Sequence, residues 1–123
     1  MIGYVTLGTC DLARSSAFYD RLLGELGAKR FMDTPRFIAW SPGRGQPGLS
    51  VALPYDGQAQ QCGNGHMTAL AVGSRANVDR LHALALELGG TDEGAVGERF
   101  PGFYAGYFRD LDGNKLNVFH MGA

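Results

Sequence analysis

Two stretches of this chain repeat each other at a fixed spacing. Residues 3–28 read GYVTLGTCDLARSSAFYDRLLGELGA, and they align without a gap on residues 65–90, GHMTALAVGSRANVDRLHALALELGG. Thr6 falls on Thr68 in this alignment, an offset of 62 residues (68 − 6) that holds throughout. A repeat whose period is about half the chain indicates that one supersecondary unit was duplicated.

A unit of this size leaves much of its apolar surface in contact with water when it is alone. We therefore expect residues 1–123 to form a single domain of two repeats, about 1–55 and 64–123, that share a core. The polar, glycine-bearing segment Tyr55–Asn64 is the expected linker. A composition of 45% hydrophobic and 19% charged residues is that of an ordinary globular protein.

Charge and terminal sequence restrict the partners. The chain has 11 Lys and Arg against 12 Asp and Glu, which argues against nucleic acid and favours a small neutral or mixed-charge ligand. The start, MIGYVTLGTCD, lacks the basic and apolar regions of a signal peptide, and no later segment resembles a membrane span. We expect a cytoplasmic protein with no membrane partner. Cys10 and Cys62 are interpreted as thiols, not as a disulfide framework.

Each repeat begins with a strand followed by a helix. In the first copy, Ile2–Gly8 is β-prone and Asp11 can cap a helix predicted over Leu12–Leu26, which Gly27 ends. Its apolar stripe is Phe18, Leu22 and Leu26. In the second copy Ser74 is the predicted cap and Gly89 the stop, and the expected buried stripe is Val78, Leu81, Ala85 and Leu88.

Short β-type segments follow each helix, so each repeat has the order βαβββ and the fold class is α+β. In the first copy they are Ala28–Asp33, Arg36–Ser41 and Leu49–Leu53. In the second copy they are a weaker strand at Thr91–Val96, then Phe103–Arg109 and Lys115–Met121. The last two flank Asp112-Gly113-Asn114, which predicts a hairpin turn because glycine adopts a positive φ without steric cost.

The chain resembles the vicinal-oxygen-chelate superfamily along nearly its whole length. This group includes glyoxalase I, bleomycin-binding proteins, fosfomycin-modifying transferases and extradiol dioxygenases. The resemblance is carried by GYVTLGTCDLARSSAFYDRLLGELGAKRF, GNGHMTALAVGSRANVDRLHALALELGGTDEGA and FYAGYFRDLDGNKLNVFH, in which RDLDGN is the most specific motif. It implies two tandem βαβββ modules that form a curled mixed sheet, as glyoxalase-like half-barrels around a cavity. One such scaffold hosts unrelated chemistries.

In catalytic members of that group the cavity holds a divalent metal through four strand residues. Carried over by resemblance, these positions fall on Tyr4, on Ala52 or a neighbour in its strand, on His66 and on Asn117. Only His66 is a good metal ligand, so the site is interpreted as degenerate, binding either no metal or a divalent ion such as Zn, Ni, Mn or Fe. Alternatively, His66 is a strand histidine hydrogen-bonded inside a polar cavity, with Tyr4 as its partner.

The two other histidines are weaker candidates. His82 lies in the middle of the second predicted helix and is expected on the solvated surface. His120 alternates with Asn117 and Phe119 along the last strand, which places it on the opposite side of the sheet from them.

A cavity without metal could still bind a ligand or catalyse acid–base chemistry. Alternation predicts inward sets that share a sheet face: Tyr4 with Thr6, His66 with Thr68, and Asn117 with Phe119, joined by Tyr104 or Tyr107. His66 is the candidate general base, Tyr4 a proton donor to an oxyanion, and Asn117 a third catalytic candidate. The rings of Phe37, Trp40 and Phe103 are candidate contacts for a planar ligand, and packing in the core is the alternative for each. Arg36 and Arg99 are candidate anchors for an anion, and simple exposure to solvent is the alternative for both.

Three functions follow. The first is a glyoxalase/bleomycin-resistance-family protein of unassigned specificity that binds a small molecule beside a degenerate metal site. The second is a divalent-metal-dependent lyase, transferase or dioxygenase whose missing ligands come from His120 or a second chain. The third is an antibiotic-sequestering resistance protein, which a net charge of −1 disfavours because a cationic drug needs an acidic cavity. We expect a homodimer, with ligand choice set by the loops Ser41–Gly48 and Glu98–Gly102.

Overall fold

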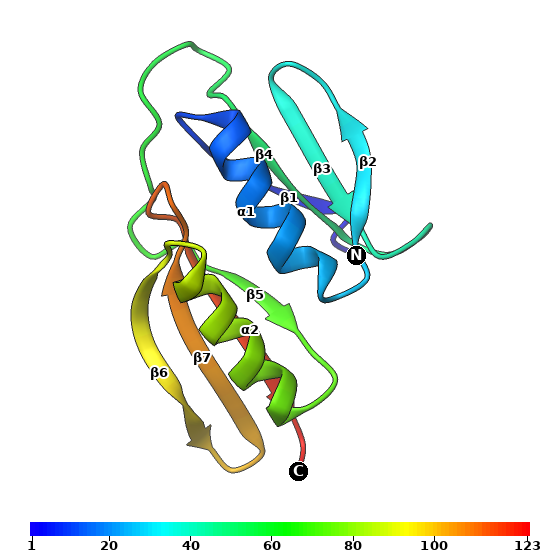
Figure 1. The fold of residues 1–123 in the computed structure, drawn as a ribbon, viewed down its shortest axis with the longest axis vertical. Coiled ribbons are helices and arrows are strands. Elements are labelled where there is room, and N and C mark those ends of the chain that lie inside the picture. The colour runs from blue at the N-terminus through cyan, green and yellow to red at the C-terminus, as the bar shows by residue number, and fades with distance from the viewer. The chain divides into compact units, whose positions relative to one another are not determined.

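The computed structural model describes residues 1–123, which form two compact units, Met1–Cys62 and Gly63–Ala123. Figure 1 shows that each unit contains one helix and one sheet. Unit 1 consists of β1 (Tyr4–Gly8), α1 (Leu12–Gly24), β2 (Lys29–Asp33), β3 (Phe37–Ser41) and β4 (Gly48–Ala52). Unit 2 consists of β5 (Thr68–Ala71), α2 (Arg75–Glu87), β6 (Thr91–Phe100), β7 (Phe103–Arg109) and β8 (Lys115–Met121). The predicted βαβββ order is confirmed in both units.

The two sheets have the same topology. Their strand orders are β1-β4-β3-β2 and β5-β8-β7-β6, and both remain open sheets with two edge strands. The first strand of each unit runs parallel to the last, with Thr6 opposite Ser50 in unit 1 and Thr68 opposite Leu116 in unit 2. All other pairs are antiparallel. Each helix packs on one face of its own sheet, here called the helix face, and leaves a far face on the other side.

Helix α1 begins where the sequence predicts and ends earlier. The side chain of Asp11 caps it by accepting a hydrogen bond from the backbone N–H of Arg14, at 3.0 Å. The predicted end at Leu26 is wrong, because the last turn tightens: the N–H of Leu26 bonds the carbonyl of Leu23, three residues back. Gly27 then takes a φ of +76°, as its predicted role at the helix end requires.

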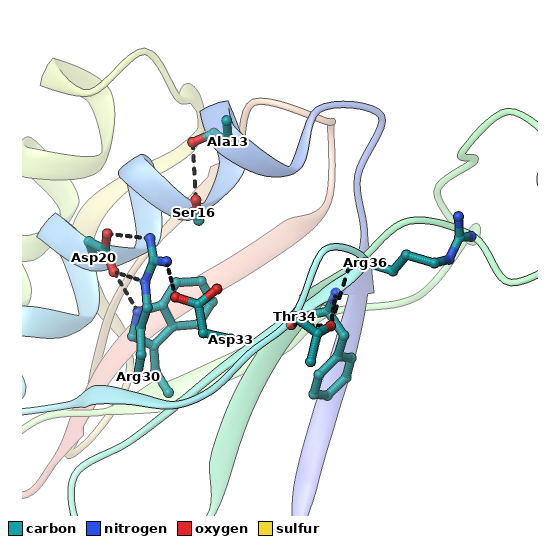
Figure 2. A network of polar contacts seen from close by, with 9 residues as sticks. Ala13, Ser16, Asp20, Arg30, Asp33, Thr34 and Arg36 are labelled. Atoms are coloured by element: carbon teal, nitrogen blue, oxygen red, sulfur yellow. Dashed lines mark hydrogen bonds and ion pairs between the residues drawn. The ribbon is translucent and has the colours of Figure 1, made fainter.

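The core of unit 1 lies between α1 and the helix face, and Trp40 is its largest buried side chain. The indole is 1% exposed, and its Nε1 donates a hydrogen bond to Asp20 Oδ1 of α1 at 2.8 Å. Figure 2 shows Asp20 also accepting two hydrogen bonds from Arg30, whose guanidinium reaches Asp33 as well. Trp40 is therefore a core residue, and the prediction that it stacks on a ligand is wrong, because almost none of its ring is accessible.

In unit 2 the helix buries a residue that the sequence places in water. Val78, Leu81 and Ala85 are buried as predicted, but His82 is also buried, at 7% exposure. Its Nε2 lies 3.0 Å from the carbonyl oxygen of Tyr107 and 3.2 Å from Asp92 Oδ1. The expectation of a solvated His82 is wrong because the strand opposite it carries a glycine, which leaves room for the imidazole.

That glycine, Gly106, yields a stability prediction. A Cβ at this position would lie 2.8 Å from Val96 Cγ1 and 2.9 Å from His82 Cδ2. We expect Gly106→Ala to lower the free energy of unfolding by about 1–3 kcal/mol, since overpacking forces neighbours off their preferred positions. The measurement is urea denaturation followed by circular dichroism. Gly24→Ala is the matched control, because nothing lies within 4 Å of a Cβ there; equal losses in both variants would contradict the packing explanation.

Two of the strands of unit 2 have the bounds that the local sequence predicts, and a third does not. Strands β7 and β8 have the predicted bounds, and Asp110 holds the turn between them by accepting hydrogen bonds from the N–H groups of Asp112 and Asn114, both at 2.9 Å. Strand β6 extends to Phe100, beyond the predicted end at Val96, through three shifts of register against β7. Such irregular pairing follows no regular alternation in the sequence, so the alternation of apolar and polar residues does not predict where β6 ends.

Neither helix has the length or apolar character needed to cross a bilayer.

Candidate functional site

Unit 1 contains a groove of about 930 Å³ at one end of its far face. The sheet contributes Thr6, Gly8, Phe37 and Ala52, and Arg36 lies at its edge. The opposite wall is formed by the irregular segment 53–61 that leaves β4, including Asp56, Gln58, Gln60 and Gln61. We call this space the unit 1 groove. Sequence reasoning treated 55–64 as a linker and missed it; the only signal was the density of glutamines in that segment.

Hydroxyl groups on adjacent strands are ordered beneath the groove. The hydroxyl of Ser50 donates to the carbonyl of Val5 at 3.0 Å, so in its 2.7 Å contact with Thr6 the Ser50 oxygen accepts. Thr6 is then the donor of that pair, and its own oxygen keeps acceptor capacity toward the groove. The far face therefore offers a polar acceptor beside the ring of Phe37.

Arg36 and Tyr4 lie near this groove in different ways. In Figure 2 the side chain of Arg36 extends away from Thr34. The backbone N–H of Arg36 donates a hydrogen bond to Thr34 Oγ1 at 3.3 Å. Its Nη2 donates to the carbonyl of Pro54 at 2.8 Å, so part of its donor capacity is used within the groove wall. Tyr4 does not line the groove; its ring meets Phe37 edge-to-face, with centroids 6.2 Å apart, and stays exposed.

His66 stands outside the regular sheet. Strand β5 begins two residues later, at Thr68, so the prediction of a strand histidine is wrong. The physical cause is a turn before the strand: the N–H of His66 bonds the carbonyl of Gly63 at 3.3 Å, and Gly65 has a φ of +91°. The imidazole lies against Gly63, where a Cβ would be 2.5 Å from Nδ1, and the side chain is exposed.

Asn117 lies on the far face of the unit 2 sheet. Gly106 faces His82 of α2 and is paired with Val118, so Val118 is on the helix face and its neighbour Asn117 is on the far face. Asn117 is 2% exposed, and its Oδ1 is buried with no hydrogen-bond partner. A buried acceptor without a donor is costly to the stability of unit 2.

Aromatic and basic side chains surround Asn117 on the same face. Tyr107 is its cross-strand partner, and the cationic groups of Arg99 and Lys115 lie 5.1 and 5.6 Å from the Tyr107 ring centroid. Arg99 also donates to two backbone carbonyls of β6, so it is partly committed within the unit. Further along the face, Phe103 stacks between Phe100 and Phe119, with centroid separations of 4.8 and 5.4 Å.

Tyr104 and His120 belong to the helix face. The hydroxyl of Tyr104 donates to Asp79 of α2, and this hydrogen bond raises the pKa of the phenol above its usual value. His120 is paired with Tyr104 across the strands, and its Nδ1 lies 2.9 Å from the carbonyl oxygen of Val72. Of the two tyrosines suggested as partners of Asn117, only Tyr107 shares its face.

The residues at the four positions assigned to a metal do not fit one. They are a phenol at Tyr4, a methyl group at Ala52, a carboxamide at Asn117 and an exposed imidazole at His66. A dication is held by several oxygen, nitrogen or sulfur ligands, usually with carboxylates or thiolates that balance its charge. The chain contains no cluster of three or more His, Cys, Asp or Glu side chains that could hold a metal ion.

Solved structures share this fold. A glyoxalase/bleomycin resistance protein from Albidiferax ferrireducens is 33% identical, with a TM-score of 0.89 over 98% of both chains. A glyoxalase/bleomycin resistance protein/dioxygenase family enzyme from Burkholderia phytofirmans is 19% identical, with a TM-score of 0.77 over 97% of both chains. A lactoylglutathione lyase from Agrobacterium tumefaciens is 21% identical, with a TM-score of 0.71 over 98% of this chain and 92% of that one. The last two show the fold alone.

A search of curated proteins finds no match. The family model of the Glyoxalase/Bleomycin resistance protein/Dioxygenase superfamily matches residues 1–118, which is nearly the whole chain. The duplicated βαβββ unit, the RDLDGN turn held by Asp110 and the similarity to the Albidiferax protein agree with that match. This chain belongs to the Glyoxalase/Bleomycin resistance protein/Dioxygenase superfamily, and its specificity is unassigned.

Proposed function

We propose that this protein binds a small organic molecule in the unit 1 groove without the help of a divalent metal. The observation that carries the proposal is the groove itself, whose volume of about 930 Å³ lies within the range of about 300–1,000 Å³ typical of ligand pockets. The four positions assigned to a metal carry no carboxylate or thiolate. This supports binding through hydrogen bonds and aromatic contacts instead of metal coordination.

The lining indicates what the ligand carries. The lining combines Gln58, Gln60 and Gln61 with Thr6 and the aromatic Phe37, and its two charged residues, Arg36 and Asp56, have opposite signs. A neutral aromatic amide matches this set, because it can stack or pack on a ring and exchange two hydrogen bonds. Within unit 2, His66 stays the candidate general base and Asn117 a candidate hydrogen-bonding residue; within unit 1, Tyr4 stays the candidate proton donor.

Benzamide is the probe for the groove. We expect saturable shifts of the backbone amide signals of residues 6–8, 52–53 and 55–61 in a nuclear magnetic resonance titration, and a several-fold loss of affinity in Thr6→Val. The matched control is Thr91→Val, an exposed threonine of unit 2. Absence of saturable shifts at millimolar benzamide, or shifts unaffected by Thr6→Val, would contradict the groove as the binding site.

The metal-dependent alternative is tested by elemental analysis of protein purified without chelator, together with His66→Ala. We expect no stoichiometric Zn, Ni, Mn or Fe in either preparation, including after incubation with excess ion. Near-stoichiometric metal that disappears in His66→Ala would overturn the metal-free proposal and favour a lyase, transferase or dioxygenase. An antibiotic-sequestering role is the remaining alternative.

We also propose that the protein acts in the cytoplasm as a homodimer. The two cysteines are exposed thiols outside any disulfide, which suits a reducing compartment. The apolar side chains exposed on the surface, among them Ile2, Phe100 and Met121, suit a contact between two copies of the chain. Sedimentation equilibrium of the purified chain measures the mass directly, and a monomer at micromolar concentration would refute the dimer.

A further inference from the structure

Unit 1 contains a second groove, of about 550 Å³, that shares no lining residue with the unit 1 groove. It is bounded by Gly27, by residues 29–31 of β2 and by the loop 41–46 that connects β3 to β4. Three of its lining residues are basic, Lys29, Arg30 and Arg44, and none is acidic. We call it the basic groove. Its charge contrasts with the chain as a whole, whose net charge is −1.

The three cations are not equivalent. Arg30 is committed to the core network, because its guanidinium bonds Asp20 and Asp33 at 2.7–2.9 Å and lies 5.8 Å from the Trp40 ring centroid. Lys29 and Arg44 take part in no ion pair. Two positive charges therefore remain uncompensated in the groove, which raises the local concentration of anions there.

An aromatic ring forms one wall beside these charges. The pairing of β2 with β3 shifts register between Arg30 and Met32, and Phe31 is the extra residue. Its ring lies over Gly48, where a Cβ would be 3.1 Å from Cε1, so the absence of a side chain at Gly48 permits this position. Phe31 is 58% exposed. Bulges often redirect a side chain next to a functional site.

The loop that carries Arg44 is held in one conformation by its own hydrogen bonds. The hydroxyl of Ser41 lies 2.9 Å from the carbonyl oxygen of Gly43 and 3.3 Å from the N–H of the same residue. The N–H of Gln46 bonds the Gly43 carbonyl at 3.1 Å, and Gly45 takes a φ of +79°. A ligand would therefore meet an ordered loop and avoid part of the entropy cost of ordering it.

We propose that the basic groove binds a planar aromatic ring that carries a phosphate or carboxylate group. The ring packs on Phe31, and the anionic group lies between Lys29 and Arg44, which donate charge-assisted hydrogen bonds to it. This site is independent of the unit 1 groove, so both can be occupied at once and each can be tested without the other.

Phenyl phosphate, benzoate and inorganic phosphate are the probes, titrated at low salt and followed by backbone amide shifts of residues 29–31 and 41–46. We expect phenyl phosphate or benzoate to saturate. The double variant Lys29→Gln/Arg44→Gln should weaken binding by about tenfold or more, because it removes two charge-assisted hydrogen bonds. Phe31→Leu should weaken phenyl phosphate several-fold while leaving inorganic phosphate unchanged. Arg21→Gln is the control for loss of a positive charge elsewhere on unit 1, since Arg21 is an exposed residue of α1 outside the groove.

The outcomes separate clearly. Saturation that is lost in the double variant and retained in Arg21→Gln supports the site. Equal affinity for inorganic phosphate and for both aromatic probes would overturn the aromatic part of the proposal and with it the assigned ligand class. Shifts that do not saturate at millimolar probe, or that are the same in all variants, would overturn the site altogether. Far-ultraviolet circular dichroism of each variant verifies that it is folded, since all the substituted side chains are exposed or at the sheet edge.

Discussion

Trp40→Ala lowers the free energy of unfolding by about 3–5 kcal/mol, the range measured when a large aromatic is removed from a core. The indole is 1% exposed and packs against Tyr19, with ring centroids 5.8 Å apart. Removing it leaves a cavity between α1 and β3 that these elements cannot fill without moving. Because Trp40 is the only tryptophan, urea unfolding of the variant is followed by circular dichroism.

Two further variants define what Trp40 does. Tyr55→Ala, at a fully exposed aromatic, should leave stability unchanged and serves as the matched control. Trp40→Phe should lose less than the alanine variant and bind benzamide as well as the original protein, since Trp40 lines neither groove. Loss of benzamide binding in a stably folded Trp40→Phe would show that the ring meets ligand after all.

Asp20→Ala lowers the free energy of unfolding by about 1–4 kcal/mol. The substitution leaves the buried indole N–H of Trp40 without an acceptor, which costs about 1–3 kcal/mol, and it removes the partly exposed pair with Arg30, which contributes about 1 kcal/mol or less. Asp20→Asn keeps an oxygen that can accept the hydrogen bond from the Trp40 indole but removes the charge that pairs with Arg30. Comparing the two variants therefore separates the two contributions. Equal losses in both variants would show that the charge, not the indole hydrogen bond, dominates.

The same carboxylate makes stability depend on pH. Hydrogen bonding from Arg30 is the main cause that holds the pKa of Asp20 below its ordinary value, and the Trp40 N–H adds to it. A depressed pKa means that this contribution is fully present above the unfolded pKa of about 3.9 and is lost as pH falls through the folded value. The stability difference between the original protein and Asp20→Asn should therefore shrink in acid. A difference that stays constant from neutral pH into strong acid would contradict this assignment.

Local chemistry explains why much of the fold was readable from the sequence. The turn between β7 and β8 is fixed by residues within five positions of one another, since Asp110 bonds the N–H groups of Asp112 and Asn114, and both flanking strands have their predicted bounds. The failures are non-local. His82 is buried because of Gly106 in a distant strand, and no helical period contains that information.

The candidate sites were only partly predictable for the same reason. Strand alternation places Asn117 and Tyr107 on one face, and it also separates them from His120. The unit 1 groove is walled by an irregular segment, and the ring of Phe31 reaches the basic groove through a bulge. Neither feature has a sequence period, so the sequence does not predict either groove. His66 was placed on a strand because the repeat alignment ignores the turn that Gly63 and Gly65 introduce.

The parallel pairing of first and last strands imposes an order on folding during synthesis. In unit 1, β4 inserts between β1 and β3 and joins Thr6 to Ser50 across 44 residues; β8 has the same place in unit 2. Neither sheet can therefore be completed until its final strand has left the ribosome, and until then β1 or β5 has no strand to pair with. Hairpins form first because closing a short loop costs less entropy. The nascent chain thus exposes two unpaired strands in succession, not both at once.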